Sequence, residues 1–219
     1  IATGDMGVSE AGEHKDSYMP GMELHAKYTV FSEGCRGNLG KELIEKFELD
    51  KDRDPQHYGL GFKEIWEIDP AKHEAGLVMH SMGWPATKDT VSGSYLYHAE
   101  GNQVALGYVV PLSYENPHLS PFDEFQQWKQ QSAIRHYLEG GKRITYGARA
   151  LIKGGPQSRP KMSFPGGLLV GDDAGTLNFA RIKGSHTAMK SGLIAAETLY
   201  SALTDESSQA SLEGHADLV

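Results

Sequence analysis

The chain has 219 residues, of which 39% are hydrophobic and 23% charged, with a formal net charge of −8 at pH 7. This composition is typical of a soluble globular protein of one large domain or two small ones. The negative charge argues against nucleic acid as a partner, because phosphate binding requires a basic surface. The single cysteine, Cys35, excludes an internal disulfide and any cluster held by four thiolates within this chain.

The first 50 residues predict a small unit of strands and one helix. A strand within residues 2–8 is expected to enter a hairpin whose tip lies near residues 10–13. Residues 22–33 alternate between apolar and polar side chains, which predicts a strand. A helix is predicted from Asn38. Its apolar face is expected to contain Leu39, Leu43, Ile44 and Phe47.

Residues 55–115 differ in character, because short β-like runs recur between turn signals. Adjacent strands with short connections predict an antiparallel or mixed sheet. Ser120 and Pro121, followed by acidic residues, predict a helix start. A second short helix is expected at residues 134–138, and a further strand at residues 143–152.

The clearest binding pattern lies between residues 164 and 201. A buried strand is predicted at residues 168–170, and it ends at Gly171 and Asp172. A carboxylate just past a buried strand accepts hydrogen bonds from ligand hydroxyls, such as the ribityl chain of a flavin. The alternative is that Asp172 only satisfies nearby backbone N–H groups.

A helix is predicted from about residue 185 to residue 203, after a loop that contains glycines. Its start comprises Lys183, Gly184, Ser185, His186 and Thr187. The free N–H groups of a helix N-terminus favour negative charge, which the reduced flavin ring carries. An ordinary helix cap is the alternative. Strand, Gly-Asp turn and helix start together predict a flavin site.

Two other turns are candidates for ligand contacts. Glu33 and Gly34 open a turn that follows a strand and precedes a helix, where it can approach a dinucleotide's phosphates. Cys35 in that turn is expected to be a small buried residue, because nothing marks a base beside it. A glycine within a strand, as at Gly93, marks a bulge or close approach to a ligand, with core packing as the alternative. The histidines lack metal spacing, so no metal site and no catalytic residue is predicted.

Eight segments resemble one known family over most of residues 1–203. They read IATGDMG, LHAKYTVFSEGCRG, YGLGFKEIW, GSYLYH, NPHLSPFDEFQQWK, LEGGKRITYGARAL, FPGGLLVGD and IKGSHTAMKSG. Together they are similar to the middle portion of electron transfer flavoprotein–ubiquinone oxidoreductase. The resemblance implies a mixed α+β or α/β fold. It consists of a partial FAD-binding domain of the glutathione-reductase type with an inserted β-rich ubiquinone-binding domain.

The resemblance also implies domain boundaries and site residues. The partial FAD-binding domain is expected at 1–50 and again at 143–203, and the inserted domain at 51–142. Residues 204–219 are polar and nearly featureless, which by itself predicts a mobile tail. Gly171 and Asp172 match the second FAD motif, and Glu33 and Gly34 the intermediate one. Residues 183–187 match the helix start beneath the flavin ring. Ser92 and Gly93 match a Gly-Gly pair whose backbone contacts the quinone head group, with Ser92 replacing the first glycine.

The implied function is electron transfer from reduced electron transfer flavoprotein, through FAD, to ubiquinone. The implied location is a bacterial cytoplasmic or mitochondrial inner membrane surface. The family's Gly-x-Gly-x-x-Gly unit, which holds the adenine half of FAD, is not found in this sequence. Nor is its C-terminal domain with a 4Fe-4S cluster. Because the chain begins at Ile1, we expect a fragment of a longer protein that retains FAD weakly and is inactive alone. The alternatives are a related FAD-dependent dehydrogenase with another acceptor, and a non-catalytic fragment without cofactor.

Overall fold

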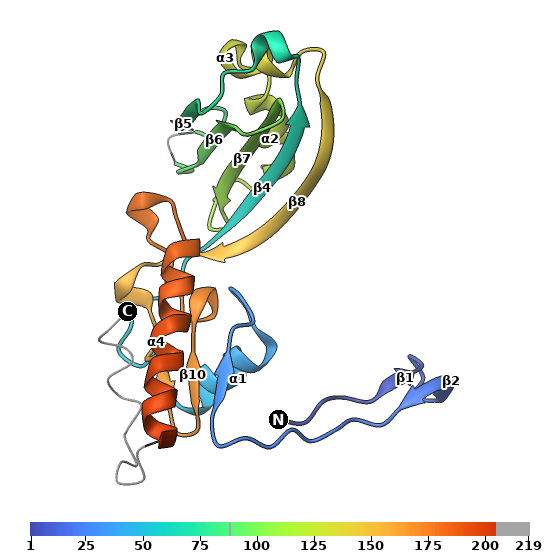
Figure 1. Cartoon of the computed structure of the whole chain (residues 1–219), viewed down its shortest axis with the longest axis vertical. Coiled ribbons are helices and arrows are strands. Elements are labelled where there is room, and N and C mark those ends of the chain that lie inside the picture. Colours follow the sequence, from blue (N-terminus) through green and yellow to red (C-terminus); the bar gives the residue numbers. More distant parts are fainter. Residues whose placement is uncertain (88, 205–219) are drawn as a thin grey trace.

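The chain has a mixed α/β fold in a computed structural model, which describes residues 1–87 and 89–204. Figure 1 shows a five-stranded sheet at the upper end, a smaller sheet beside a long helix below, and a hairpin that projects to one side. The predicted mobile tail lies almost wholly outside the described residues. Within the described part, no helix is both long and apolar enough to cross a membrane.

The projecting hairpin is formed by β1 (Met6–Val8) and β2 (His14–Met19), which pair antiparallel. The turn between them is closed at both ends by Ser9 and Glu13. The Ser9 N–H donates to the Glu13 carbonyl at 2.8 Å, and the Glu13 N–H donates to the Ser9 hydroxyl at 3.0 Å. The predicted hairpin is therefore confirmed.

The strand predicted over residues 22–33 is much shorter than its alternation suggested. Strand β3 contains only Thr29–Phe31, and an isolated bridge between Ala2 and Glu23 is the other β pairing in this segment. Leu24 is 57% exposed and Val30 is 41% exposed. Alternation produces a strand only where a neighbouring strand supplies hydrogen bonds and another layer covers the apolar face. Leu24 still exchanges hydrogen bonds with Ile1, but the described part of the chain supplies neither along residues 25–27.

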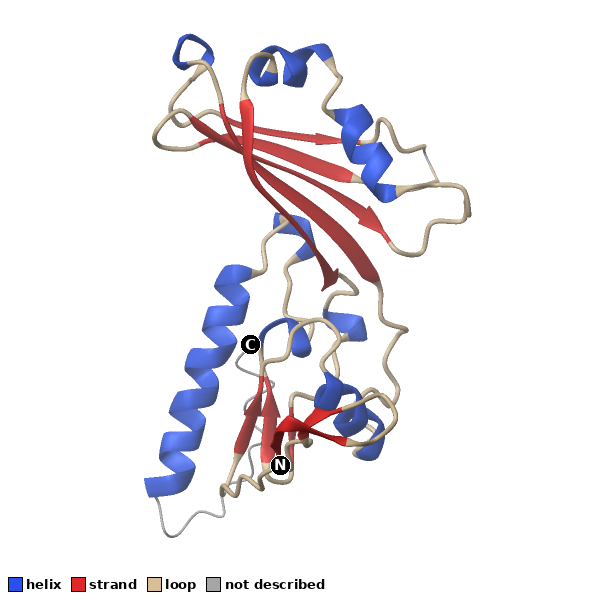
Figure 2. Ribbon diagram, turned by 90° about the vertical axis from the view of Figure 1, so that its right-hand side faces the viewer, coloured by secondary structure: helices blue, strands red, loops and turns tan. Residues whose placement is uncertain are grey.

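The smaller sheet has the order β3-β10-β9, with β9 at Ser163–Phe164 and β10 at Gly167–Leu169. Strand β10 runs parallel to β3 and antiparallel to β9. On one side, helix α1 (Asn38–Lys46) and Phe47 pack against a cluster that includes Leu169, as the predicted apolar face requires. On the other side, helix α4 (Ser185–Thr204) runs beside the smaller sheet (Figure 2). Its Ala195 packs with Leu168 and Val170. The predicted buried strand and final helix are thus confirmed.

The five-stranded sheet is antiparallel throughout and has the order β5-β6-β7-β4-β8. Its strands are β4 (Tyr58–Glu67), β5 (Val78–Met82), β6 (Gly93–His98), β7 (Gln103–Pro111) and β8 (Lys142–Ile152). Strand β8 pairs with β4 along its whole length, from Tyr58 opposite Ile152 to Glu67 opposite Lys142. One-turn helices η1 (Pro70–Lys72) and η2 (Pro156–Ser158) lie in the connections.

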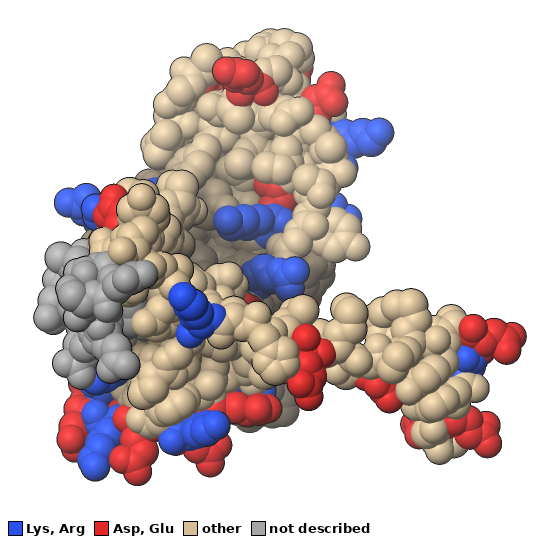
Figure 3. Space-filling view, turned by 60° about the horizontal axis from the view of Figure 1, so that its bottom comes forward, with Lys and Arg blue, Asp and Glu red and all other residues tan. Residues whose placement is uncertain are grey.

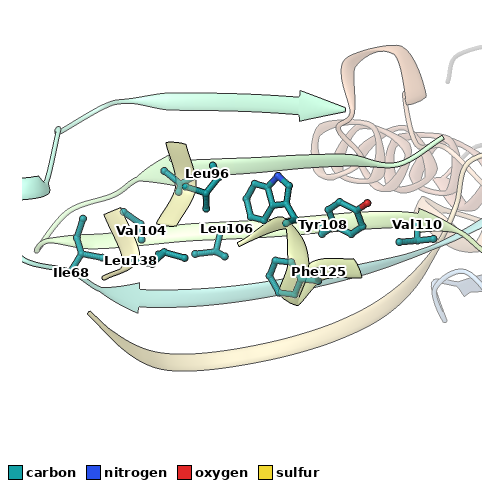
Figure 4. Close-up of a cluster of buried hydrophobic side chains, with 10 residues drawn as sticks. Ile68, Leu96, Val104, Leu106, Tyr108, Val110, Phe125 and Leu138 are labelled. Atoms are coloured by element: carbon teal, nitrogen blue, oxygen red, sulfur yellow. The ribbon is translucent and has the colours of Figure 1, made fainter. Parts of the chain in front are cut away.

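Helices α2 (Pro121–Trp128) and α3 (Ser132–Leu138) cover one face of this sheet. Ser120 caps α2, because its hydroxyl accepts from the Asp123 N–H at 3.3 Å. Phe125 and Trp128 of α2 are buried, whereas Phe122 is half exposed. Figure 4 shows the resulting core between α2 and strands β6 and β7. Its ten buried residues are Ile68, Leu96, Val104, Leu106, Tyr108, Val110, Phe125, Trp128, Ile134 and Leu138.

A buried ion pair lies within this core. The Lys129 ammonium group lies 2.8 Å from one oxygen of Glu64, and the guanidinium group of Arg143 lies 3.2 Å from the other. The indole N–H of Trp66 also donates to the Glu64 carboxylate at 2.7 Å. The carboxylate is therefore almost fully paired, as a buried charge must be.

Candidate functional site

The turns that follow β3 and β10 meet because these strands are parallel neighbours that end together. Leu169 lies opposite Phe31 in the register. The first turn contains Glu33 and Gly34, and the second is the one-turn helix η3 (Gly171–Asp173). The Glu33 N–H points to the Asp173 carboxylate at 3.5 Å. In open α/β sheets, ligands bind at the carboxyl ends of parallel strands. The structure thus gathers two predicted contact segments at one such edge.

Glu33 uses its side chain to cap helix α1. Its carboxylate accepts from the N–H groups of Leu39 and Gly40 at 3.0 and 2.9 Å. The N-cap residue Gly37 has no side chain for this task. A carboxylate at this position also complements the helix dipole. Glu33 therefore shapes the turn, while Gly34, with φ of +89°, gives the turn a backbone conformation that glycine favours.

Asp172 lies half-buried on η3. Its two carboxylate oxygens lie 3.3 and 3.4 Å from the Ile152 N–H. Burial raises the pKa of this carboxyl group, and the hydrogen bond from Ile152 opposes the shift. A half-buried carboxylate with one backbone donor keeps further lone pairs available for a ligand's hydroxyl groups.

Sequence reasoning did not single out the neighbouring Asp173. Its carboxyl group is buried against the N-cap residue Gly37 and against Gly40 of α1, where any larger residue would collide with it. Burial raises its pKa to about 6, opposed by the hydrogen bond from the Glu33 backbone and assisted by repulsion from Glu33 and Asp172. The spacing of the two glycines around a helix start was the available signal, and it is weak.

The start of α4 packs against η3. Gly171, with φ of +61°, donates its N–H to the Ser191 hydroxyl at 2.9 Å. A Cβ at Gly171 would lie 3.5 Å from the Ala188 side chain, so the two backbones are close. Ser185 and His186 are exposed, and the Thr187 hydroxyl donates to the Gly184 carbonyl at 2.8 Å. The Gly-Asp turn and the helix start, predicted as one site, are thus adjacent.

Lys183 connects this region to the five-stranded sheet. Its ammonium group donates to the Tyr97 hydroxyl at 2.8 Å and lies 5.2 Å from the centre of the Tyr97 ring. The same hydroxyl lies 3.1 Å from Nε2 of His80 on β5. Lys183 therefore reaches strand β6, four residues beyond Gly93. A link between residues so distant in the sequence left no local pattern to detect.

Ser92 and Gly93 lie at the start of β6, away from the other predicted contact residues. The buried Ser92 hydroxyl donates to the Gly83 carbonyl at 2.7 Å and accepts from the Tyr108 hydroxyl at 2.9 Å. Tyr108 belongs to the core under α2, so the Ser92 side chain points to that side of the sheet. The side-chain atoms that Ser92 has in place of the family's glycine therefore lie away from the other face of the sheet.

A cavity of about 650 Å³ lies beside α1, where it is lined by residues that include Cys35, Arg36, Tyr58 and Asp173. Figure 3 shows basic side chains in and around a hollow in the middle of one face. Cys35 is half-buried rather than buried as expected, and burial, followed by repulsion from Asp172, raises the pKa of its thiol. A raised pKa argues against a nucleophilic role. No cluster of three potential metal ligands occurs among the described residues.

Comparison with known proteins identifies both parts of the chain. Residues 58–151 match the family described as ETF-QO, ubiquinone-binding. The chain is 64% identical over 204 residues to a probable electron transfer flavoprotein-ubiquinone oxidoreductase of Acinetobacter baylyi. It is 52% identical over 216 residues to the mitochondrial electron transfer flavoprotein-ubiquinone oxidoreductase of Bos taurus. These matches cover 93% and 98% of the chain but only 36% and 35% of the two relatives.

Solved structures share the fold at low sequence identity. The flavin-dependent brominase Bmp2 is similar with a TM-score of 0.64 and 15% identity, over 91% of this chain and 50% of the brominase. A geranylgeranyl bacteriochlorophyll reductase-like protein of Thermoplasma acidophilum gives 0.59 and 16%, over 94% of this chain and 48% of that protein. These likenesses concern the fold alone. By its sequence, the chain belongs to the electron transfer flavoprotein–ubiquinone oxidoreductase family, and it spans about a third of the length of the relatives compared.

Proposed function

We propose that this chain forms the central part of an FAD-dependent oxidoreductase that passes electrons from reduced electron transfer flavoprotein to ubiquinone. One observation carries the proposal. The ubiquinone-binding family matches residues 58–151, and the five-stranded sheet with its two helices runs from Tyr58 to Ile152. A segment that folds around its own core and coincides with the family match supports quinone binding by this sheet unit, residues 58–152.

The sheet unit takes the place of the inserted domain expected at 51–142. Its pairing of β8 with β4 favours moving the second boundary from residue 142 to residue 152. Residues 1–57 and 153–204 then form the cofactor unit. The two chain crossings at Tyr58 and Ile152 lie opposite each other in the sheet, as expected for an insertion with adjacent ends.

The residues present fit one end of FAD. A Cβ at Gly34 would meet no atom within 4 Å, so ligand atoms can approach that backbone. The exposed start of α4 offers unpaired N–H groups beside the half-buried carboxylate of Asp172. Such donors and acceptors suit a cofactor with both hydroxyl groups and anionic character. FAD, when bound, supplies a centre that accepts and releases electrons.

Each residue has a distinct role in this proposal. Asp172 holds ribityl hydroxyl groups, and Gly171 keeps the turn close to α4. The segment of Lys183, Gly184, Ser185, His186 and Thr187 stabilises negative charge on the flavin ring. Glu33 acts indirectly, because its carboxylate is already bound to the start of α1 and so fixes the turn at Gly34. The 4Fe-4S cluster belongs to a further domain, since this chain has one cysteine.

The partners follow from the substrates. Ubiquinone is an apolar molecule that resides in membranes. The sheet unit therefore works at the surface of a bacterial cytoplasmic membrane or of a mitochondrial inner membrane. Reduced electron transfer flavoprotein docks where it can reach the cofactor unit.

The purified chain tests the quinone assignment directly. Isothermal titration calorimetry with decylubiquinone is expected to show saturable binding with a stoichiometry near one. Absence of saturable binding by a folded chain would refute quinone binding by the sheet unit. The cofactor assignment is tested in a longer polypeptide that retains FAD. There Asp172→Ala is expected to lower the flavin-to-protein absorbance ratio, and an unchanged ratio would remove Asp172 from the cofactor site.

A further inference from the structure

His98, the last residue of β6, is a buried histidine whose ring binds a backbone group of another segment. It is 5% exposed, and its Nδ1 accepts a hydrogen bond from the Glu74 N–H at 3.0 Å. A ring nitrogen that accepts from a backbone N–H carries no proton, so the proton of the neutral ring lies on Nε2. Nε2 is also buried, and it meets no hydrogen-bonding group of the described residues.

The segment bound by His98 is the β4–β5 connection, residues 68–77, which lies beside α3 at the upper end of the sheet unit (Figure 1). The Tyr137 hydroxyl on α3 donates to the Glu74 carboxylate at 2.7 Å. At the end of the connection, the His98 N–H donates to the Leu77 carbonyl at 2.9 Å. Strand β5 follows directly and is the outermost strand of the sheet beside β6. The connection therefore determines where this edge strand begins.

Ionisable groups approach the His98 ring from the connection and from α3. The ring centre of His73 lies 5.1 Å from that of His98, and the ring centre of Tyr137 lies 4.7 Å from it. Strand β7 places the apolar Val104 opposite His98. Burial lowers the pKa of His98 from its ordinary 6.5, repulsion from His73 lowers it further, and attraction by Glu74 opposes both. The ionisable neighbours are His73 and Glu74 in the connection, and Tyr137 and His136 on α3.

We infer that His98 is an acid-sensitive clasp, which holds the β4–β5 connection and strand β5 in place while its ring is neutral and releases them when the ring is protonated. A second proton must bind to Nδ1, the atom that accepts from Glu74. Two N–H groups then face each other, and the buried charge has no acceptor at Nε2 among the described residues. Release of the connection removes this conflict, because the charged ring then reaches water.

The direction of the pH dependence follows from the lowered pKa. The released ring takes up a proton with the ordinary pKa of 6.5, whereas the clasped ring does so only at lower pH. The clasp is therefore fully effective above about pH 6.5 and weakens as the pH falls below that value. Release leaves β6 as the edge of the sheet and uncovers the part of the core on which Met79 of β5 packs.

Hydrogen–deuterium exchange of the purified chain, followed by mass spectrometry at pH 7.5, 6.5 and 5.5, tests the inference. Peptides from residues 73–82 report on the clasp and β5, and peptides from the central strand β7 are the internal reference. After correction for the intrinsic pH dependence of exchange, the opening of β5 relative to β7 is expected to increase about 10-fold from pH 7.5 to 5.5. This is the factor for one proton taken up with the ordinary pKa of histidine. A parent chain without this increase overturns the inference.

His98→Asn separates the clasp from other effects of acid. The amide oxygen of asparagine replaces Nδ1 as the acceptor and does not titrate, so the exchange of β5 is expected to lose its pH dependence. His80→Asn is the matched control, because His80 is an exposed histidine on β5 itself, and it is expected to keep the 10-fold increase. Circular dichroism shows whether each variant is folded. If folded His98→Asn keeps the increase, or if His80→Asn loses it, the clasp is wrong.

Two further measurements do not depend on the folding of His98→Asn. Tyr137→Phe removes the hydrogen bond to Glu74 but leaves His98 in place. It is expected to increase the exchange of β5 at every pH and to keep the pH dependence. Nitrogen NMR of the parent chain at pH 7.5 is expected to show the His98 proton on Nε2. A neutral His98 ring with its proton on Nδ1 overturns the inference.

Discussion

The sheet unit and the cofactor unit bury their apolar side chains to different extents. The sheet unit has one core of ten buried residues, whereas the cofactor unit has two clusters, of six and three, on opposite sides of β10. Helix α4 also exposes large apolar residues, namely Met189, Leu193, Tyr200 and Leu203. Stability follows the apolar area removed from water. The sheet unit is therefore expected to be the more stable of the two, and the cofactor unit to gain from whatever covers α4.

The two units can be observed separately. All three tryptophans, at positions 66, 84 and 128, lie in the sheet unit. The longest helix, α4, lies in the cofactor unit. Tryptophan fluorescence therefore follows the unfolding of the sheet unit, while helical circular dichroism is weighted toward the cofactor unit. If the sheet unit is the more stable of the two, urea produces two unfolding transitions. The fluorescence transition then lies at the higher urea concentration.

The largest expected effect comes from Lys129→Met. Lys129 neutralises the buried Glu64 carboxylate, and the remaining partner, Arg143, is 43% exposed. Loss of one partner leaves a buried charge undercompensated, which costs about 3–5 kcal/mol. Urea denaturation followed by tryptophan fluorescence should show this loss in the sheet unit, with the circular dichroism transition unchanged.

The control for Lys129→Met is Arg135→Met, which removes an exposed pair with Glu139 on α3 of the same unit. Exposed ion pairs contribute about 0–1 kcal/mol. If Lys129→Met is as stable as Arg135→Met, the buried ion pair between Lys129 and Glu64 does not stabilise the sheet unit.

Leu106→Ala and Leu169→Ala apply one substitution to both units. Each side chain is fully buried, Leu106 in the sheet unit core and Leu169 beneath α1. A buried Leu→Ala change costs about 2–5 kcal/mol. The first should shift the fluorescence transition alone, and the second should shift the circular dichroism transition alone. Equal shifts of both transitions by either variant would mean that the two units unfold as one.

Asp173→Asn is expected to change the pH dependence of the cofactor unit. Burial raises the pKa of this carboxyl group to about 6 from the usual 3.8, so the folded state favours its protonated form. The stability contributed by the protonated form is fully present below about pH 4 and is lost as the pH rises through about 6. We expect a loss of about 1–3 kcal/mol across this range in the parent chain.

In Asp173→Asn this loss should shrink, because an amide does not titrate, and the part due to Asp172, whose pKa burial also raises, should remain. Urea midpoints of the circular dichroism transition at pH 4.5, 5.5 and 7 measure the slope. The fluorescence transition of the same samples is an internal control, since Asp173 lies outside the sheet unit. A variant with the parent's slope would place the titrating group elsewhere.

Sequence patterns sufficed where a few neighbouring residues determine the structure. The cap at Ser120, the turn between Ser9 and Glu13 and the buried strand at residues 168–170 are local features, and all three are present. The approach of Gly171 and Asp172 to α4 was also predicted, from the order of strand, Gly-Asp turn and helix start along one segment of the chain.

The features that sequence patterns did not predict depend on contacts between segments far apart in the sequence. Residues 25–27 continue an alternation typical of a strand but have no pairing partner in the described part of the chain. The sequence predicted that Glu33 contacts a ligand. In the structure its carboxylate instead caps helix α1, whose own N-cap residue, Gly37, has no side chain. Asp173 resembled a loop residue because its burial depends on Gly37 and Gly40, far away in sequence. Composition and spacing do not encode such pairings.

The smallest expected effect tests whether the two units are coupled at all. Lys183 belongs to the cofactor unit and Tyr97 to the sheet unit, and their hydrogen bond and cation–π contact are exposed. Lys183→Met should therefore cost only about 0.5–1 kcal/mol. Because the contact joins the units, the loss should appear as a wider separation between the two transitions. A double-mutant cycle with Tyr97→Phe separates the hydroxyl from the ring, since phenylalanine keeps only the cation–π contact. A coupling energy of zero between Lys183 and Tyr97 would mean that the units touch there without stabilising each other, and that the orientation of the helix start relative to β6 is fixed elsewhere.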